Sequence, residues 1–356
     1  MFREIATSFP SAQEDAVRRR ICLVYLFLVG LNVAAWALAF AVFHAYPVPL
    51  SLCFFAYGLG LQHAVDADHI AAIDNVTRKL MQEHKRPVAV GFFFSLGHST
   101  VVILLSLLVA QGTGYVKNHF PEFQQVGGII GTSISAFFLL LIAVVNFIIF
   151  LEVFKRFQAA RKGSHCEGDA LQDMLNGPGL VARVLRRLFG LVGESWHMYF
   201  VGFLFGLGFD TATEIALLGI AATQAAHQAP IWSIMVFPLL FTCGMCLLDT
   251  TDGIVMLGAY GWAFVKPVRK LFYNMTITLV SFMIALLIGS LEAVNVLAAK
   301  FHLQTGVWAY LNVANDNSTL LGYGIIGLMM ASWLASMVVY RVAGFEELDE
   351  GEALAE

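Results

Sequence analysis

The stretch HAVDADHIAAIDN, residues 63–75, places two histidines and three aspartates in one short segment of a markedly apolar chain. Hydrophobic residues make up 58% of the 356 residues, charged residues make up only 13%, and the mean hydropathy is +0.74. This composition lies outside the range of soluble domains and indicates a protein embedded in a lipid bilayer. Because ionisable side chains are costly inside a bilayer, their concentration here predicts a functional site.

Eight apolar segments are long enough to cross the membrane as helices, since about 20 helical residues span ~30 Å of hydrocarbon. They are 21–45, 49–75, 88–111, 126–153, 198–223, 231–264, 274–298 and 319–342. Their apolar runs are continuous, whereas the strands of a membrane barrel alternate between apolar and polar residues. We therefore predict an all-α polytopic membrane protein with eight transmembrane helices.

The predicted helices form two groups of four. The expected parts are a cytoplasmic N-terminal segment 1–20, helices 21–153, a cytoplasmic linker 154–197, helices 198–342 and an acidic cytoplasmic tail 343–356. All of the 21 Lys and Arg residues except Lys117 and Lys300 fall on one side of this arrangement. The positive-inside rule then places both termini in the cytoplasm. We expect a multi-pass protein of a bacterial cytoplasmic (inner) membrane.

On a straight helical wheel, three residues of the segment share one face: His63, Asp66 and His69. Asp74 shares that face, whereas Asp68 points away from it. The two histidines are separated by ~9 Å of helical rise, which makes joint binding of one ion awkward. Either two overlapping binding stations or local unwinding around Gly58 and Gly60 would resolve this.

Three other predicted helices carry ionisable residues at similar depth. One helix carries His98, the second carries the pair Asp210 and Glu214, and the third carries the pair Asp249 and Asp252. Any one of them could be a structural hydrogen-bonding group. As a set, however, they combine imidazoles with carboxylates that no Lys or Arg within the spans neutralises, and this combination is typical of a site for a divalent transition-metal ion.

Two segments show a faint internal similarity. YGLGLQHAVDADHI (57–70) and FGLGFDTATEI (205–215) share an aromatic-Gly-Leu-Gly lead that is followed by acidic residues. The predicted topology makes the two helices antiparallel. The pattern suggests an inverted repeat of two four-helix halves, which many transporters use to build a site at the midplane of the membrane.

Four motifs together resemble the signature segments of the nickel/cobalt transporter family of eight-helix metal permeases. They are HAVDADHI (63–70), GFFFSLGHSTVV (91–102), GLGFDTATE (206–214) and GMCLLDTTD (244–252). The resemblance implies high-affinity uptake of Ni²⁺ or Co²⁺ without ATP. It also implies essential roles for His63, Asp66, Asp68 and His69. Gln62 departs from the family, whose members often have Arg at this position.

We therefore expect a permease in which His63, Asp66 and His69 bind the metal ion, with His98 as a further ligand. The resemblance adds Asp68 to this set. The ion would then pass towards the cytoplasm along acidic residues, which are Asp210, Glu214, Asp249 and Asp252. Moving two charges inward through 100 mV releases about 4.6 kcal/mol, so the membrane potential, the proton gradient or both would drive uptake.

The expected partners are the transported metal ion and the lipid bilayer, with no resident cofactor and no nucleic acid. The chain contains no GxxxxGK[ST] sequence, and no ATPase subunit is implied; the absence of HExxH argues against a metalloprotease-type enzyme. Two alternatives remain: an efflux transporter for the same metals, and an intramembrane metal-dependent enzyme. The segment 154–197 carries only His165 and His197, whereas exporters often have a His-rich stretch.

Overall fold

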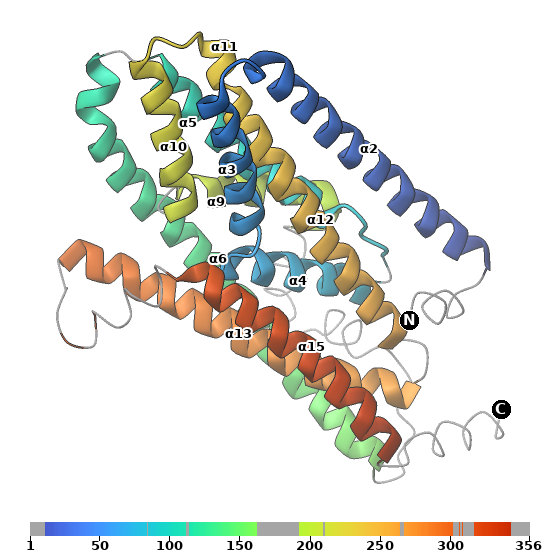
Figure 1. Ribbon diagram of the computed structural model, residues 1–356. Helices are drawn as coiled ribbons and strands as arrows, with labels where there is room; N and C mark the ends of the chain where they lie inside the picture. The colour runs from blue at the N-terminus through green and yellow to red at the C-terminus, as the bar shows by residue number, and fades with distance from the viewer. Residues whose placement is uncertain are drawn as a thin grey trace.

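The computed structural model describes residues 11–83, 85–111, 114–161, 192–208, 211–263, 267–301, 306, 308 and 317–342. These residues form helices and connecting turns and contain no strand, which confirms the predicted all-α class (Figure 1). The elements are α2 (Ser11–Phe43), α3 (Pro47–His63), α4 (Ala67–Gln82), α5 (Val90–Ala110), α6 (Gly114–Arg161), the 3₁₀ turn η1 (Ser195–His197), α9 (Met198–Gly206), α10 (Ala212–Ala226), α11 (Ile231–Ile234), α12 (Val236–Ala263), α13 (Pro267–Phe301) and α15 (Ser318–Val342). Most of the predicted linker 154–197 and all of the predicted tail 343–356 lie outside the described residues.

Several helices are long and apolar enough to cross a membrane. Within the described residues there are five such helices, and the bent pair α3 and α4 would make a sixth. Two shorter apolar helices are Ala212–Ala226 and Ser318–Ser332. The protein is therefore a multi-pass helical membrane protein, while the predicted total of eight spans remains a prediction.

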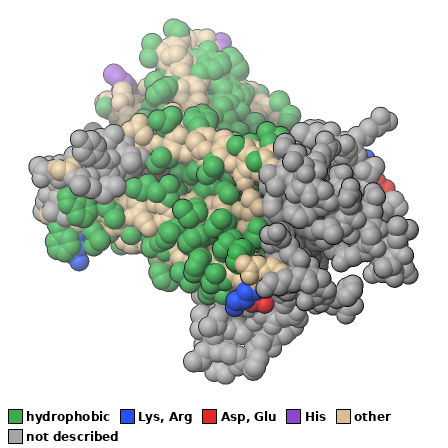
Figure 2. Space-filling model, turned by 90° about the horizontal axis from the view of Figure 1, so that it is seen from below, with side chains coloured by type: hydrophobic (Ala, Val, Ile, Leu, Met, Phe, Trp, Pro, Cys, Tyr) green, Lys and Arg blue, Asp and Glu red, His purple; other side chains and the backbone are tan. Residues whose placement is uncertain are grey.

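The surface of the helical bundle is apolar where the side chains are described. Large side chains such as Leu26, Phe137 and Leu320 are more than two-thirds exposed. Figure 2 shows hydrophobic side chains spread across the described part of one face, with few charged groups among them. Such a surface is suited to lipid, because a soluble monomer rarely exposes apolar patches of this extent.

The predicted span 49–75 is not one continuous helix, because the chain breaks between His63 and Ala67. Helix α3 ends at His63 and α4 begins at Ala67, and the two axes differ in direction by 53°. At the break Asp66 has extended backbone, with φ −63° and ψ 145°. Gly58 and Gly60 both lie inside α3, so the unwinding falls a few residues after the expected place.

The predicted helix 198–223 is also broken. It consists of α9 and α10, and Thr211, the residue just before α10, has extended backbone, as Asp66 has just before α4. A Gly-Leu-Gly sequence lies near each break: 58–60 is inside α3, three residues before its end, and 206–208 begins at the last residue of α9. Discontinuous helices of this kind are common at the binding sites of transporters.

Helix α5 lies at the centre of the bundle and contacts α9, α10 and α12. Its contact with α9 is a direct approach of two backbones. A Cβ atom added to Gly202 would lie 1.9 Å from the carbonyl oxygen of Phe94, and one added to Gly97 would lie 1.9 Å from that of Tyr199. The glycines are therefore required for this close packing, and they hold α5 and α9 together as a pair.

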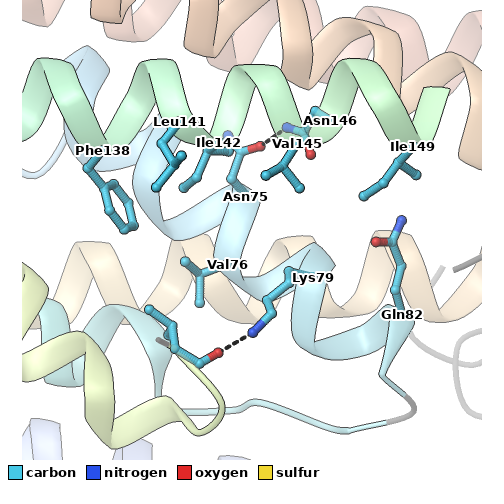
Figure 3. Close-up of a pocket in the computed structure, with 11 residues that line it drawn as sticks. Asn75, Val76, Lys79, Gln82, Phe138, Leu141, Ile142, Val145, Asn146 and Ile149 are labelled. Atoms are coloured by element: carbon cyan, nitrogen blue, oxygen red, sulfur yellow. Dashed lines mark hydrogen bonds between the residues drawn. The ribbon is translucent and has the colours of Figure 1, made fainter. Parts of the chain in front are cut away.

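A buried cation lies inside α4, which corrects the expectation that no Lys or Arg lies within the spans. The side chain of Arg78 is 1% exposed and donates to Thr278 Oγ1 at 2.8 Å and to Asn146 Oδ1. Asn146 in turn donates to Asn75 Oδ1 at 2.5 Å (Figure 3). Hydrogen bonds to amide and hydroxyl oxygens thus help to satisfy the guanidinium and tie α4 to α6 and α13.

Figure 3 shows the small cavity beside this network, which has a volume of about 70 Å³ and lies between α4 and α6. Its walls are mostly apolar, and Lys79 at its edge donates to the carbonyl oxygen of Val192. No carboxylate lines it among the described residues. This cavity is therefore a poor candidate for a metal site.

Candidate metal site

Three histidines from three helices meet in the interior of the protein. His63 ends α3, His69 lies in the first turn of α4 and His98 lies in α5. Their rings are 4.6–4.9 Å apart between centroids, and one possible ligand atom from each lies within 4.8 Å of the others. All three are at most 3% exposed. The break after His63 brings His63 and His69 together, which a straight helix would not do.

The His63 ring is oriented by a carboxylate. Its Nδ1 atom lies 2.9 Å from Asp66 Oδ2 and 3.1 Å from the hydroxyl of Thr213. The other carboxylate oxygen of Asp66 accepts a hydrogen bond from Thr319 of α15 at 2.5 Å. Since an ionised carboxylate can only accept, Nδ1 of a neutral His63 carries the hydrogen and Nε2 carries the lone pair.

The His69 ring is held in the same way from a different helix. Its Nδ1 atom lies 3.2 Å from Asp249 Oδ2 of α12, and that oxygen also accepts a hydrogen bond of 2.5 Å from Ser95. Within the described part of the chain, the Nε2 atom of His69 and the Oδ1 atom of Asp249 have no hydrogen-bond partner, although both are buried. Unsatisfied buried polar atoms are costly, so they point to a missing ligand at this place.

His98 faces a second carboxylate, that of Glu214 in α10. Its Nε2 atom lies 2.9 Å from Glu214 Oε1 and also 2.9 Å from His63 Nε2. The distance between Glu214 Oε1 and His63 Nε2 is 4.0 Å. Thr211 donates to the other oxygen of Glu214 at 2.8 Å and so fixes the direction of this carboxylate. The prediction placed Glu214 on the later part of the pathway, but in the structure it lies directly against the histidines.

The predicted site residues are therefore divided between several places. Asp68 does not join the histidine cluster: it is partly exposed and lines a separate cavity between α4, α6 and α13. Asp74 accepts a hydrogen bond from Ser281 of α13 at 2.9 Å. Asp252 lies one helical turn beyond Asp249, and its Oδ2 atom has no hydrogen-bond partner among the residues that the structure describes. Asp210 lies outside the described residues.

The straight-helix wheel explains two of these differences. The wheel correctly separated Asp68 from His63. It wrongly grouped Asp74 with the two histidines, because it assumed that the helix continues unbroken through residues 64–66. After the break, α4 runs in another direction, so residues beyond His69 turn away from the cluster. A helical wheel holds only within one unbroken helix.

Glu292 of α13 was not among the predicted site residues, although it is 8% exposed and lines the same cavity as Asp68. The signal was present, because Glu292 is the single ionisable residue in the predicted span 274–298. Sequence analysis also missed the hydroxyl groups that orient the carboxylates. Those of Ser95, Thr211 and Thr319 lie on three helices, and sequence alone does not show that they meet.

The chemistry of the cluster suits a divalent cation. The imidazoles of His63, His69 and His98 converge with the carboxylates of Glu214 and, behind the rings, Asp66 and Asp249. Phe94 and Phe241 pack against the rings, at centroid distances of 4.8 Å to His69 and 5.6 Å to His63. Imidazole is a good ligand for nickel, cobalt, zinc and copper ions, and the surrounding carboxylates compensate the charge of the ion.

Comparison with known proteins agrees with this chemistry. The family described as high-affinity nickel-transport protein matches residues 50–339 of the chain. The chain belongs to this family of nickel transporters. This confirms the resemblance that the four motifs indicated, and it places the chain among transporters and not among enzymes.

Individual relatives cover most of the chain. A high-affinity nickel transport protein of Cupriavidus necator is 48% identical over 330 residues, which are 93% of this chain and 94% of the relative. The high-affinity nickel-transport protein NixA of Helicobacter pylori is 43% identical and covers 81% of this chain and 87% of its own. The cobalt transport protein NhlF of Rhodococcus rhodochrous is 38% identical and covers 80% of each chain. No solved structure matches the chain.

Proposed function

We propose that the protein takes up Ni²⁺, and Co²⁺ as a related substrate, through a site formed by His63, His69, His98 and Glu214. The observation that carries this proposal is the orientation of two imidazoles. The Nδ1 atoms of His63 and His69 face the carboxylates of Asp66 and Asp249, so their Nε2 atoms are left with lone pairs that point into the cluster. This carboxylate–histidine arrangement is a general way of preparing imidazole for a metal ion.

The distances within the cluster support the same reading. Two ligand atoms that each lie ~2.1 Å from an ion, at right angles, are ~3.0 Å apart. The pairs His63 Nε2 with His98 Nε2, and His98 Nε2 with Glu214 Oε1, are each separated by 2.9 Å. Without an ion, the single N–H of His98 cannot fully serve both of its neighbours, whereas a cation would be bound by all three atoms.

The choice of metal is supported by the relatives and by ligand type. Nickel appears in the names of the Cupriavidus and Helicobacter proteins, and cobalt in that of the Rhodococcus protein. Imidazole and carboxylate suit both ions, and affinity alone would favour Cu²⁺ over either. Selectivity in this proposal therefore depends on the geometry that the four helices impose.

The pathway follows from the topology that we propose: eight spans, with both termini in the cytoplasm of a bacterium, as the distribution of Lys and Arg favours. The helix breaks near the two Gly-Leu-Gly sequences, 58–60 and 206–208, support an inverted repeat in which each half supplies one broken helix. The ion would leave the histidines past Asp249 and Asp252 of α12. The membrane potential would supply about 4.6 kcal/mol per divalent ion at 100 mV.

The decisive test is uptake of radiolabelled Ni²⁺ and Co²⁺ into proteoliposomes, with an imposed membrane potential and, separately, a pH gradient. We expect inward accumulation driven by potential, and its loss in His63→Ala and Asp66→Asn at unchanged protein content. His44→Ala, which alters an exposed histidine, is the matched control. Undiminished uptake by the His63 variant would refute the site, and movement only in the outward direction would establish an exporter instead.

A further inference from the structure

We propose that a second polar cavity, lined by Asp68 and Glu292, is the outer vestibule in which the hydrated metal ion is collected before the histidines bind it. This inference rests on the proposed function and adds a station to it. The cavity has a volume of about 240 Å³. Its polar lining comes from five helices and consists of Asp68, Thr132, Ser135, Thr211, Glu292 and Ser318.

The composition of the lining suits a hydrated ion. Two carboxylates face the cavity together with four hydroxyl groups, and the described lining contains no Lys, Arg or His. Asp68, Glu292 and Ser318 also line a smaller adjoining cavity of about 30 Å³, so the two acids, from α4 and α13, border the same space. Intramembrane ionisable residues that face a polar cavity commonly mark an ion pathway.

The volume of the cavity fits an ion that keeps its water. A water molecule occupies about 30 Å³ in the liquid, so the cavity has room for an ion with most of its hydration shell. The histidine cluster differs in this respect, because its ligand atoms are close enough to touch one ion directly. The two places therefore suit two successive states of the ion, first hydrated and then dehydrated.

Two hydrogen bonds connect the cavity to the histidine cluster. Thr211 lines the cavity and donates at 2.8 Å to Glu214, whose other oxygen contacts His98. Ser318 lines the cavity next to Thr319, which donates to Asp66 behind His63. An ion that leaves the cavity thus meets Glu214 as its first carboxylate of the cluster.

The position of the lining residues along their helices places the cavity on the outer side. Ser318 is the first residue of α15, Glu292 lies near the end of α13, and Thr132 lies in the first half of α6. The opposite ends of these helices adjoin Lys155, Arg161, Lys266 and Arg341, and under the positive-inside rule those ends are cytoplasmic. The cavity therefore lies on the side from which uptake begins.

The first experiment measures Ni²⁺ uptake as a function of concentration for Glu292→Gln. We expect the concentration for half-maximal uptake to rise about tenfold, with the maximal rate retained, because a cleft of one charge sign concentrates counter-ions. Glu194→Gln, which removes an exposed carboxylate away from the cavity, should leave both values unchanged. An unchanged concentration dependence in Glu292→Gln would overturn the proposal.

A second experiment does not depend on transport. In a variant without the five native cysteines, Ser318→Cys is labelled from outside with a positively charged, membrane-impermeant methanethiosulfonate reagent. We expect Ni²⁺ to slow this labelling, and we expect Glu292→Gln to abolish the protection. Ser51→Cys, at an exposed position near the start of α3, should be labelled at the same rate with and without Ni²⁺.

The two proposals can fail separately. Loss of uptake in His63→Ala, with Ni²⁺ protection of Ser318→Cys retained, would support both the site and the vestibule. Labelling of Ser318→Cys that Ni²⁺ does not alter would refute the vestibule, even if uptake still requires His63. If Glu292→Gln does not reach the membrane, the vestibule is tested by whether Ni²⁺ protects Ser318→Cys in the cysteine-free variant that retains Glu292.

Discussion

The Nδ1 atom of His69 lies 3.2 Å from Asp249 Oδ2, so a contact between α4 and α12 fixes which nitrogen of the imidazole faces the cluster. Partners of this kind typically change metal affinity by about 10–100-fold when they are removed. We expect Asp249→Asn to raise the Ni²⁺ concentration for half-maximal uptake within that range. Kinetics of radiolabelled uptake measure this, with the exposed Asp15→Asn as control. A wild-type value for Asp249→Asn would show that this contact does not tune the ligand.

Glu214 lies against His98, and the structure predicts that it acts with the histidines. Glu214→Gln keeps the size and a hydrogen-bond acceptor but removes the charge. We expect it to reduce uptake as severely as His98→Ala, because a neutral amide oxygen is a much weaker ligand for a divalent cation than a carboxylate oxygen, and His98→Ala removes the imidazole ligand beside it. Direct Ni²⁺ binding to the purified protein, measured by calorimetry, should be weakened in both variants. Normal binding with slow transport would instead place Glu214 later on the pathway.

Two neighbouring glycines of α3 should respond differently to the same substitution. A Cβ added to Gly60 would lie 2.1 Å from the carbonyl oxygen of Phe241 in α12, whereas one added to Gly58 meets nothing within 4 Å. Overpacking of this kind costs about 1–3 kcal/mol. Gly60→Ala should therefore lower the thermal unfolding midpoint in detergent and reduce uptake. Gly58→Ala should do neither, and equal effects of the two would contradict the packing of α3 on α12.

The network around Arg78 should contribute to stability. Asn146→Ala removes an acceptor of the buried guanidinium and the donor to Asn75. Leaving buried polar groups unsatisfied costs about 1–3 kcal/mol each. We expect a lower unfolding midpoint for this variant, measured in detergent micelles. Thr223→Ala, an exposed position whose hydroxyl bonds only within its own helix, is the control; a midpoint equal to that control would contradict the role of the network.

The fold class and most of the candidate site were predictable from sequence for simple reasons. Long apolar runs require helices in lipid, and ionisable residues inside such runs are rare enough to mark a site. On this basis His63, His69 and His98 were selected, and the structure brings all three together. The family was also predictable, because four motifs in order are specific.

The spacing of the two histidines made local unwinding one of two alternatives, but the position of the break between α3 and α4 was not predictable, because its partners are distant in sequence. Asp66 accepts from Thr319, which is 253 residues away, and nothing in HAVDADHI itself requires the helix to stop. The same reason explains the errors over Asp74 and Arg78. Both lie beyond the break in α4, where the straight-helix assumption gave Asp74 a wrong neighbour and the predicted span, which ended at residue 75, left Arg78 out.

The close approach of α5 and α9 has a consequence for how the site opens. Backbones in contact at Gly97 and Gly202 leave no room for one helix to slide against the other, so His98 is the fixed point of the cluster. His63, His69 and Glu214 each lie within a few residues of a discontinuity in their helix. Rotation about the backbone at 64–66 would therefore move His63 and His69 relative to His98, and we expect the site to open at this bend and not within the α5–α9 pair.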